Sequence, residues 1–415
     1  MICEIITIGD ELLIGQVVDT NSAWMASRLN LIGVRVKQIT SVSDDSNHII
    51  EALNAARKRA EVILITGGLG PTRDDLTKET LCNYFQSDLI EDQKVVDDLT
   101  RFFKSRGREL TATNRRQAEI PVKSIPIYNS HGTAPGMWFE DQGQVFVSMP
   151  GVPYEMKAMM EDMVLPKLAA TFHLPKVFHY SIITTGVGES FLADLIKDWE
   201  DQLPDYIKLA YLPSIAMVKL RLSCYAADVT KEHELMVEVE KVKLLIHNYI
   251  FGFNDDTPES IIGSLLLERK ETLAIAESCT GGYLSHLVTS MPGCSSYYIG
   301  STISYANKVK TEFLGVDAGS IETEGAVSEK VARAMASGVR AKLGTTWAIS
   351  TTGIAGPGGG TEEKPVGTVW IGLAGPHGVT AQMFQFGHNR LRNIQATSLF
   401  AFKMLRNQIL GIIED

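Results

Sequence analysis

Two residues in the C-terminal third of this 415-residue chain, Ser278 and Lys310, have the chemical types and the settings that a nucleophile and its general base require. Ser278 lies in the segment 276–282, between a predicted strand and a predicted helix. A nucleophile at that position lies at the positive end of the helix, where backbone N–H groups can bind a developing oxyanion. Lys310 lies in a second polar strand end, 305–310, and a lysine whose pKa is lowered by burial can deprotonate a nearby serine.

Each of these residues also has a purely structural interpretation. Ser278 or Thr280 caps the helix, as serine and threonine commonly do, and Lys310 lies on a solvated helix face. Cys279 is an alternative nucleophile, but we rank it below Ser278 because a small buried cysteine after a helix-start serine satisfies the same pattern. Neither segment contains a histidine, so a Ser-His-Asp arrangement has little support.

A third polar strand end, 350–360, is a glycine-rich loop that includes Thr352. Such a loop brings backbone N–H groups close to a phosphate or carbonyl oxygen, and Thr352 can add a hydroxyl to the serine and the lysine. An ordinary flexible loop is the alternative. Three polar, glycine-rich strand ends in one small domain are nevertheless hard to explain by folding alone.

The N-terminal half contains a second set of residues suited to a phosphate ligand. The segment 66–77 holds three glycines and two adjacent carboxylates: Gly67, Gly68, Gly70, Asp74 and Asp75. The glycines can wrap an anion, and the carboxylates suit a hard cation such as Mg²⁺ that bridges to phosphate oxygens. Asp10 and Glu11 end the first predicted strand and can converge on the same crevice. Alternatively, the two aspartates cap a helix beginning at Leu76, and Asp75 is the better placed because it immediately precedes that helix.

Strand ends of this kind meet only if parallel sheets bring them together. In the first 170 residues, strands are predicted over 2–8, 34–40 and 62–66, and helices over 21–31 and 47–59. This alternation predicts a parallel α/β sheet with crossover helices, whose ligands bind at the carboxyl ends of the strands.

The last part of the chain repeats the alternation. Its predicted strands cover 273–277, 297–305, 346–351, 366–373 and 379–386, and its predicted helices cover 282–289, 327–343 and 391–409. Between the two α/β regions, strands over 178–185 and 216–225 and helices over 191–198 and 229–246 predict a small α+β module. We therefore expect three domains, over 1–172, 176–253 and 258–412.

The composition excludes several classes of protein. Hydrophobic residues make up 45% of the chain and charged residues 21%, a balance typical of globular domains. The net charge of −10 argues against general binding to nucleic acid or to anionic membranes. The five cysteines are scattered and form no CxxC pair, which favours a reducing, cytoplasmic setting over disulfides or a structural zinc site. No apolar run approaches the ~20 residues that cross a bilayer.

The motifs of the last domain resemble those of the competence/damage-inducible protein CinA family. The resemblance rests on the segments 276–282, 325–328, 353–357 and 363–369, and with the N-terminal motifs it covers essentially the whole chain. It implies that this domain is a nicotinamide mononucleotide deamidase, a serine amidohydrolase that uses no cofactor. It further implies Ser278 as the nucleophile and Lys310 as its base, with Tyr305 and Thr352 in the hydroxyl network.

The other substrate contacts expected in this domain come from the nucleophile turn, the glycine-rich loop and the closing helix: Cys279, Thr280, Gly281, Gly282, Gly353, Gly356 and Arg392. The 5′-phosphate of the substrate needs donors, and we expect Arg392, or its neighbour Arg390, to supply them.

The N-terminal half resembles the molybdopterin-binding fold in the segments 67–70, 131–136 and 148–156, although Leu69 replaces the usual threonine. In the CinA family this half is associated with hydrolysis of ADP-ribose to AMP and ribose 5-phosphate. The resemblance implies a requirement for a divalent cation, Mg²⁺ or Co²⁺, with K⁺ as an activator. The expected ligand contacts are Gly9, Asp10, Glu11, Gly67, Gly68, Gly70, Pro150 and Gly151, with Asp74 and Asp75 at the metal.

The middle module resembles the KH-type domain of the same family. A nucleic-acid-binding KH module needs a Gly-x-x-Gly loop, which the segment 186–189 does not provide. Residues 177–252 also carry 7 Lys+Arg against 11 Asp+Glu, so we interpret the module as a spacer or dimerisation element. The resemblance implies a homodimer. The main alternative to a two-activity enzyme is an inert nucleotide- or pterin-binding protein, and a role in DNA uptake predicts a basic surface that the composition lacks.

Overall fold

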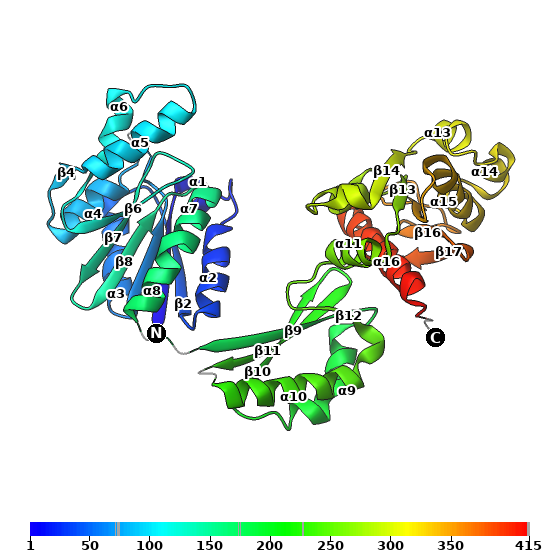
Figure 1. Cartoon of the computed structure of the whole chain (residues 1–415), viewed down its shortest axis with the longest axis horizontal. Helices are drawn as coiled ribbons and strands as arrows, with labels where there is room; N and C mark the ends of the chain where they lie inside the picture. Colours follow the sequence, from blue (N-terminus) through cyan, green and yellow to red (C-terminus); the bar gives the residue numbers. More distant parts are fainter. Residues whose placement is uncertain (71, 73–74, 173, 175, 226–227, 413–415) are drawn as a thin grey trace. The chain divides into compact units, whose positions relative to one another are not determined.

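The structure is a computed structural model that describes residues 1–412 apart from 71, 73–74, 173, 175 and 226–227. By their internal contacts the residues form two compact units, Met1–His179 with Ser223–Glu234, and Tyr180–Leu222 with Leu235–Asp415. The three larger sheets lie in the N-terminal, middle and C-terminal parts of the chain (Figure 1). None of the helices in the described ranges is long and apolar enough to cross a membrane.

The N-terminal sheet has six strands in the order β2-β1-β3-β8-β7-β6. Their bounds are β1 Ile2–Ile8, β2 Arg35–Val42, β3 Val62–Thr66, β6 Ser124–Ile127, β7 Gly136–Asp141 and β8 Gln144–Met149. The strands β2, β1 and β3 pair in parallel, as predicted, whereas the parallel strand β8 and the antiparallel edge strands β7 and β6 were not predicted. Because β1, β3 and β8 are neighbours, the strand ends that lead to Gly9, Gly67 and Pro150 lie side by side.

Helices cover both faces of this sheet (Figure 1). Their bounds are α1 Asp10–Leu13, α2 Asn21–Leu31, α3 Ser46–Arg57, α4 Thr77–Phe85, α5 Gln93–Ser105, α6 Ala112–Arg115, α7 Pro153–Met159 and α8 Leu165–Thr171, and a small strand pair joins β4 Leu89–Glu91 to β5 Glu119–Pro121. Met25 of α2 packs with Ile5 in one buried cluster, and Leu53 of α3 packs with Ile6 in the other. Since successive side chains of a strand point to opposite faces, β1 is buried on both sides.

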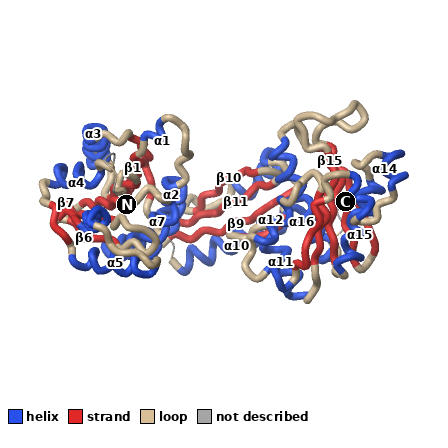
Figure 2. Tube along the Cα trace, turned by 90° about the horizontal axis from the view of Figure 1, so that it is seen from above, coloured by secondary structure: helices blue, strands red, loops and turns tan. Residues whose placement is uncertain are grey.

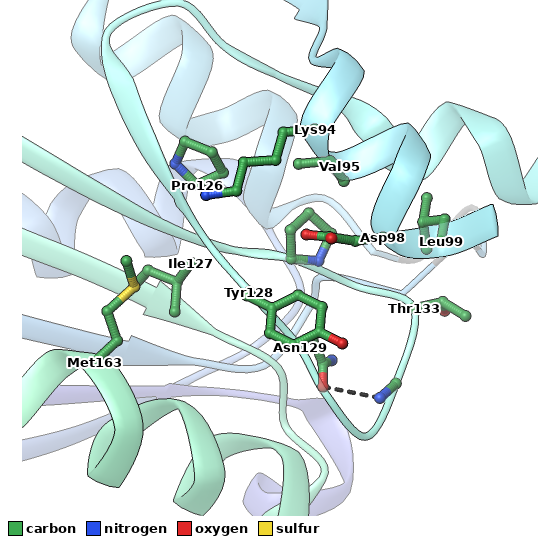
Figure 3. A pocket seen from close by; sticks show the side chains of 12 residues that line it. Lys94, Val95, Asp98, Leu99, Pro126, Ile127, Tyr128, Asn129, Thr133 and Met163 are labelled. Carbon is green, nitrogen blue, oxygen red and sulfur yellow. Dashed lines mark hydrogen bonds between the residues drawn. The ribbon is translucent and has the colours of Figure 1, made fainter. Parts of the chain in front are cut away.

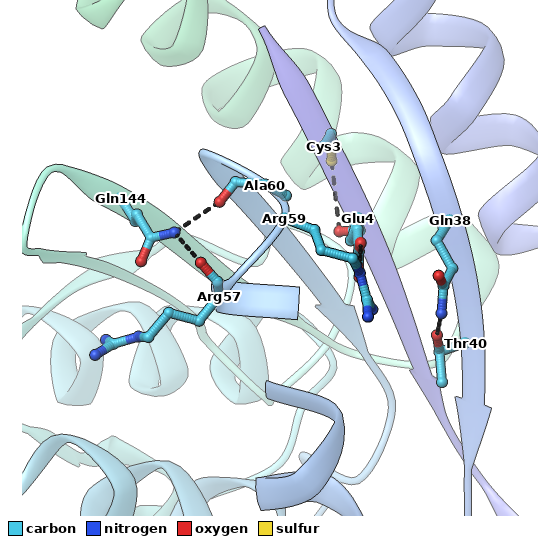
Figure 4. Close-up of polar contacts among 8 residues, drawn as sticks. All are labelled: Cys3, Glu4, Gln38, Thr40, Arg57, Arg59, Ala60 and Gln144. Atoms are coloured by element: carbon cyan, nitrogen blue, oxygen red, sulfur yellow. Dashed lines mark hydrogen bonds and ion pairs between the residues drawn. The ribbon is translucent and has the colours of Figure 1, made fainter. Parts of the chain in front are cut away.

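Polar side chains tie the end of α3 to the sheet (Figure 4). The Glu4 carboxylate is 1% exposed and accepts two hydrogen bonds from Arg59, at 2.6 Å from Nε and 2.8 Å from Nη2. Gln144 donates from Nε2 to the carbonyl oxygens of Arg57 and Ala60, at 2.7 Å each. These bonds satisfy polar groups whose burial without partners costs free energy. They hold the end of α3 against β1 and β8, away from the strand ends that carry the predicted site.

The middle module is a four-stranded sheet in the order β10-β11-β9-β12 with two helices. The bounds are β9 Val177–Thr185, β10 Ile207–Ser214, β11 Met217–Tyr225, β12 Ile250–Phe253, α9 Glu189–Glu200 and α10 Val229–Leu245. The predicted strands and helices match β9, β11, α9 and α10 to within two residues at each end, whereas β10 and β12 were not predicted. Strand β10 is mostly part-exposed or exposed, so its sequence lacks the clear apolar alternation that marks a strand.

The C-terminal sheet has five strands in the order β14-β13-β15-β16-β17. The bounds are β13 Leu273–Glu277, β14 Tyr298–Ile303, β15 Trp347–Gly353, β16 Thr368–Gly375, β17 Gly378–Gln385, α11 Pro258–Arg269, α12 Tyr283–Thr289, α13 Asn307–Glu312, α14 Ala318–Glu324, α15 Glu329–Leu343 and α16 Arg390–Leu410. The sheet lies between α11, α12 and α16 on one face and α14 and α15 on the other (Figure 2). Strands β14, β13 and β15 are parallel, so their carboxyl ends meet at one edge.

Candidate active site

Ser278 directly follows the central strand β13, between the ends of β14 and β15. All five residues of β13 are buried, which fixes the backbone that leads into the serine. The Ser278 N–H donates to the carbonyl oxygen of Thr351 on β15, at 2.9 Å. The serine is therefore held, buried, at the edge where the three parallel strands end.

Lys310 reaches the serine from the next strand end. It lies on α13, which begins four residues after β14 ends, and its side chain is 1% exposed. Its Nζ lies 3.0 Å from Ser278 Oγ and also donates to the carbonyl oxygens of Ser304 and Tyr305, at 2.7 and 3.2 Å. The alternative of a solvated lysine on a helix face is therefore wrong.

The surroundings of Lys310 favour a neutral amine. Burial lowers the pKa of Lys310 below its ordinary value, against a smaller opposing effect from the Cys279 thiol. The three acceptors of its Nζ are uncharged, and none of the ion pairs found in the described part of the chain includes this lysine. An amine that loses its proton readily and touches a serine hydroxyl has the geometry and the chemistry of a general base.

Cys279, the alternative nucleophile, lies next to Ser278 but points into the core. It belongs to the buried apolar cluster of the C-terminal domain, and burial raises the pKa of its thiol to about 12. A thiol with that pKa stays protonated near neutral pH and is a weak nucleophile.

We expect Cys279→Ala to keep hydrolytic activity within about threefold of the unsubstituted chain, because the thiol stays protonated and packs as a small apolar group. The measurement is kcat on the substrate proposed below. A fall in kcat of about 10³-fold would instead make the thiol the nucleophile.

Glu277 occupies the helix end that was expected to bind an oxyanion. Its fully buried carboxylate accepts hydrogen bonds from the backbone N–H groups of Gly282, Leu284 and Ser285, at 2.9, 3.1 and 2.9 Å, and from the Ser285 hydroxyl. The expectation that the first N–H groups of α12 are free is therefore wrong for these three. A carboxylate at a helix N-terminus is favoured by the helix dipole, so the glutamate before Ser278 was a readable signal that sequence reasoning missed.

The capping interpretation of Ser278 and Thr280 is also wrong. The residue at the N-cap of α12 is Gly282, and the Thr280 hydroxyl pairs with the Thr351 hydroxyl at 2.7 Å. With the helix end taken by Glu277, the Thr280 N–H meets no acceptor among the described residues, and the Cys279 N–H contacts only its own thiol there. They are the donors available beside Ser278 for an oxyanion.

The remaining predicted polar residues lie around Ser278 and Lys310, but not all of them form hydrogen bonds with these two residues. The Tyr305 hydroxyl accepts a hydrogen bond from Arg390 Nη2 at 3.1 Å, and Arg390 Nη1 donates to the Gly356 carbonyl at 2.8 Å. The Thr352 hydroxyl donates instead to the Ala326 carbonyl at 2.7 Å. Arg390 thus links Tyr305 to the glycine-rich loop.

Arg392 is exposed in the first turn of α16, and its backbone N–H donates to the side chain of Asn389. Its role as a phosphate donor stays a prediction, but Arg390 is the arginine that the structure brings to a predicted site residue. Sequence reasoning could not choose between two arginines two positions apart, because the choice depends on the direction of the helix.

The glycines of the loop after β15 have a packing role. Gly356 has φ +92°, and a Cβ on it would lie 2.6 Å from Val366 Cγ1. A side chain there would clash, so glycine is needed for the loop to fold back beside Arg390. Gly281 and Gly282, in the turn before α12, also have positive φ angles.

The predicted N-terminal residues gather around a cavity of about 530 Å³. Its lining includes seven of the eight predicted contacts: Gly9, Glu11, Gly67, Gly68, Gly70, Pro150 and Gly151. Asp10 lies beside it and donates its backbone N–H to the Asp44 carboxylate at 3.0 Å. Gly67 has φ +114°, and a Cβ on it would lie 2.1 Å from the Ile8 carbonyl, so only glycine fits at this junction of β1 and β3.

Of the two predicted metal ligands, Asp75 lines the cavity and Asp74 lies outside the described residues. The expectation that Asp75 caps α4 is wrong. That helix begins at Thr77 without a side-chain cap, and the Asp75 carboxylate accepts hydrogen bonds from the Thr72 N–H, at 2.9 Å, and the Thr72 hydroxyl.

Two carboxylates of the cavity, Asp44 and Glu155, were not predicted. Asp44 follows β2 and Glu155 lies on α7, just after β8, so both follow strands of the parallel group. Burial raises the pKa of Asp44, and the negative charges of Asp10, Glu11 and Asp75 raise it further. The cavity therefore concentrates negative charge, which a bound cation would neutralise.

Comparison with known proteins matches three family models to successive parts of the chain. They are described as "Probable molybdopterin binding domain" over residues 4–170, "Damage-inducible protein CinA KH domain" over 179–252, and "CinA C-terminal domain" over 255–409. In the KH-like part, the segment 186–189 before α9 reads Gly-Val-Gly-Glu, with Gly188 at the N-cap. This turn is therefore not a Gly-x-x-Gly loop.

Relatives match over nearly their whole length. The chain is 46% identical to a CinA-like protein of Cytophaga hutchinsonii, covering 98% of this chain and 97% of the relative. It is 45% identical to a CinA-like protein of Flavobacterium psychrophilum, covering 98% of both. A solved structure of a CinA protein from Thermoplasma acidophilum, titled as of unknown function, is 34% identical and covers 40% of this chain and 96% of its own, with a TM-score of 0.37. With its three domains matched in order and its relatives matched from end to end, this chain belongs to the CinA family.

Proposed function

We propose that the C-terminal domain deamidates nicotinamide mononucleotide to nicotinic acid mononucleotide and ammonia. The observation that carries this proposal is the 3.0 Å contact between the buried Lys310 Nζ and Ser278 Oγ. A serine next to a readily deprotonated amine suits acyl transfer, and the family resemblance supplies the amide substrate.

The reaction runs through an ester on the serine. Ser278 Oγ attacks the carboxamide carbon while Lys310 takes the hydroxyl proton, and the N–H groups of Cys279 and Thr280 bind the oxyanion. Lys310 then returns the proton to the leaving nitrogen, and ammonia departs. Water, deprotonated by Lys310, attacks the nicotinoyl ester, which releases the carboxylate product and restores Ser278.

Arg390 is the residue we assign to the phosphate of the substrate. Its guanidinium is already held by the Tyr305 hydroxyl and the Gly356 carbonyl, both uncharged, so an anionic group can bind without reorganising it. A planar fork of N–H donors matches phosphate geometry.

The test is release of ammonia and nicotinic acid mononucleotide in equal amounts from nicotinamide mononucleotide. Nicotinamide riboside and free nicotinamide serve as comparison substrates, and we expect both to react more slowly because they lack the phosphate. Absence of ammonia from all three substrates with folded protein would overturn the proposal.

The Glu277→Gln variant tests whether the buried carboxylate positions Ser278. An amide cannot accept all of the bonds that Glu277 receives from Gly282, Leu284 and Ser285, so the turn shifts. We expect kcat to fall by about 10²-fold, the effect of a small misplacement of reacting groups, with a smaller change in KM. Steady-state kinetics measure both constants, and an unchanged kcat would contradict the positioning role.

We also propose that the N-terminal domain hydrolyses the pyrophosphate bond of ADP-ribose, giving AMP and ribose 5-phosphate. The supporting observation is the cavity, whose lining includes glycine backbone from two strand ends together with several carboxylates. Glycine backbone binds phosphate oxygens, and a divalent cation between phosphates and carboxylates neutralises both.

The carboxylates of this cavity fit a divalent cation that shares its coordination with the substrate. Among the residues whose positions are described, no three His, Cys, Asp or Glu side chains are grouped to hold an ion alone. Mg²⁺ is commonly bound by one or two carboxylates together with phosphate oxygens. We therefore assign Asp44 and Asp75 as its protein ligands, where it would polarise the pyrophosphate.

We expect EDTA to abolish AMP release from ADP-ribose, and added Mg²⁺ or Co²⁺ to restore it, because the carboxylates and phosphates repel one another without a cation. The deamidase reaction of the same sample is the control, and we expect it to be unaffected. Full hydrolysis of ADP-ribose in EDTA would contradict the metal assignment.

A further inference from the structure

An apolar pocket adjoins the acidic cavity of the N-terminal domain. It lies between α5 and the loop 128–135 and has a volume of about 50 Å³ (Figure 3). Its walls include Val95 and Leu99 of α5 and Ile127 at the end of β6, all buried. Figure 3 shows Lys94 and Asp98 extending from α5 above the Tyr128 ring. The pocket thus combines an apolar wall and an aromatic face with one cationic and one anionic group.

The loop between the two hollows is held in place by Asn129, which is 6% exposed. Its Oδ1 accepts from the N–H groups of His131 and Gly132, at 3.0 and 2.8 Å. Its Nδ2 donates to the Ala134 carbonyl at 2.9 Å and to the Glu155 carboxylate at 2.7 Å. Because Glu155 lines the acidic cavity and Asn129 lines the apolar pocket, one side chain ties the two hollows together.

The two hollows are also continuous in their lining, since Thr133 belongs to both. One hollow offers glycine backbone and carboxylates, which suit phosphates with a cation. The other offers apolar walls with a few placed polar groups, which is typical of a site for a planar organic ring. A nucleotide presents these two kinds of surface at its two ends.

We propose that the pocket between α5 and the loop 128–135 binds the amino-substituted purine base of the nucleotide whose phosphates lie in the acidic cavity. This inference rests on the proposed N-terminal function and names its base-recognition site. The Tyr128 ring, half exposed, stacks on the base. The Asp98 carboxylate, which Arg101 already contacts on one oxygen, accepts a hydrogen bond from the exocyclic amine, and Lys94 donates to a ring nitrogen.

The enclosed and exposed parts of the pocket contact different parts of the base. A volume of about 50 Å³ admits the edge of a ring system, where Asp98 reads the amine. The rest of the base lies over the exposed face of Tyr128. An adenine then differs from a hypoxanthine at the group that meets the carboxylate, because hypoxanthine has a carbonyl oxygen there and two acceptors repel each other.

The experiment compares ADP-ribose with its hypoxanthine counterpart in the unsubstituted chain and in Tyr128→Ala and Asp98→Asn. Asp97→Asn is the matched control, since Asp97 is the exposed neighbour on the same helix and, among the residues that the structure describes, accepts only from Gln93. We expect kcat/KM for ADP-ribose to exceed that for the hypoxanthine substrate by about tenfold, from the lost hydrogen bond. We expect Asp98→Asn to remove that preference and Tyr128→Ala to raise KM by about tenfold with little change in kcat, from lost stacking.

Equal use of the two substrates, a preference that persists in Asp98→Asn, or an unchanged KM in Tyr128→Ala overturns the base pocket while leaving ADP-ribose hydrolysis intact. If the unsubstituted chain hydrolyses neither substrate, the proposed N-terminal function fails, and calorimetric titration with AMP and IMP decides the pocket separately. Preferential binding of AMP that is lost in Asp98→Asn supports it. Equal binding of AMP and IMP, or binding of neither, overturns it.

Discussion

Replacing Ser278 with alanine removes deamidation of nicotinamide mononucleotide, lowering kcat by at least about 10³-fold, as loss of a nucleophile does in other serine hydrolases. The fold survives the change. Lys310 Nζ loses one of its three acceptors but keeps the carbonyl oxygens of Ser304 and Tyr305, so no buried group is left without a partner. The measurement is kcat from ammonia release, together with the thermal midpoint of unfolding.

Ser290→Ala is the control for this variant. Ser290 is exposed at the end of α12, and its hydroxyl donates only to the Leu287 carbonyl, so its removal should leave kcat unchanged. Acid quenching during turnover should also trap an acyl group on the peptide that contains Ser278. Ammonia release at the original rate by the alanine variant, or an acyl group on another residue, would sink the assignment.

The position of Ser278 and Lys310 could be predicted from sequence because it follows from topology. Both residues come after predicted strands, and parallel neighbours place their carboxyl ends at one edge of the sheet. The same reasoning placed Gly9 and Gly67 at one crevice, whereas Pro150 was expected from the family resemblance, since β8 was not predicted. These predictions needed only the order of the strands, which the alternation of strands and helices indicates.

Side-chain direction could not be predicted in this way. Glu277 belongs to the same motif as Ser278, and a carboxylate suits a helix N-terminus, but the three N–H groups that it binds are fixed by packing. The Thr352 hydroxyl faces Ala326 rather than the nucleophile, and Arg390 rather than Arg392 meets Tyr305. Each of these outcomes depends on rotamers and helix rotation, which period and spacing leave open.

The strands β6 and β10 were missed for a related reason. Strand β10 and the edge strand β6 include exposed positions and a proline each, so neither shows a continuous apolar run. The strands buried on both faces, such as β3 and β13, were predicted at their observed bounds. Burial on both faces helps recognition without guaranteeing it, since the buried strand β8 was not predicted.

Lys310→Met and Lys310→Arg should both lower kcat for deamidation by at least about 10²-fold, the usual contribution of a general base. Methionine keeps the volume of the side chain and removes the amine. Arginine keeps the positive charge, but its guanidinium does not release a proton in the working pH range. Activity in the arginine variant would show that charge alone suffices and would overturn the role as a base.

The pH dependence of the unsubstituted chain gives an independent test of the same residue. Burial lowers the pKa of Lys310 below 10.5, so kcat/KM should rise with pH through that lowered pKa, as the amine loses its proton. Stability should rise in the same direction. Between the folded and unfolded pKa values the unfolded chain binds one proton more, so the free energy of unfolding increases with pH. Lys310→Met should lack this increase, and matching unfolding curves for the two proteins from about pH 7 to about pH 10 would show that the lysine is charged in the native state.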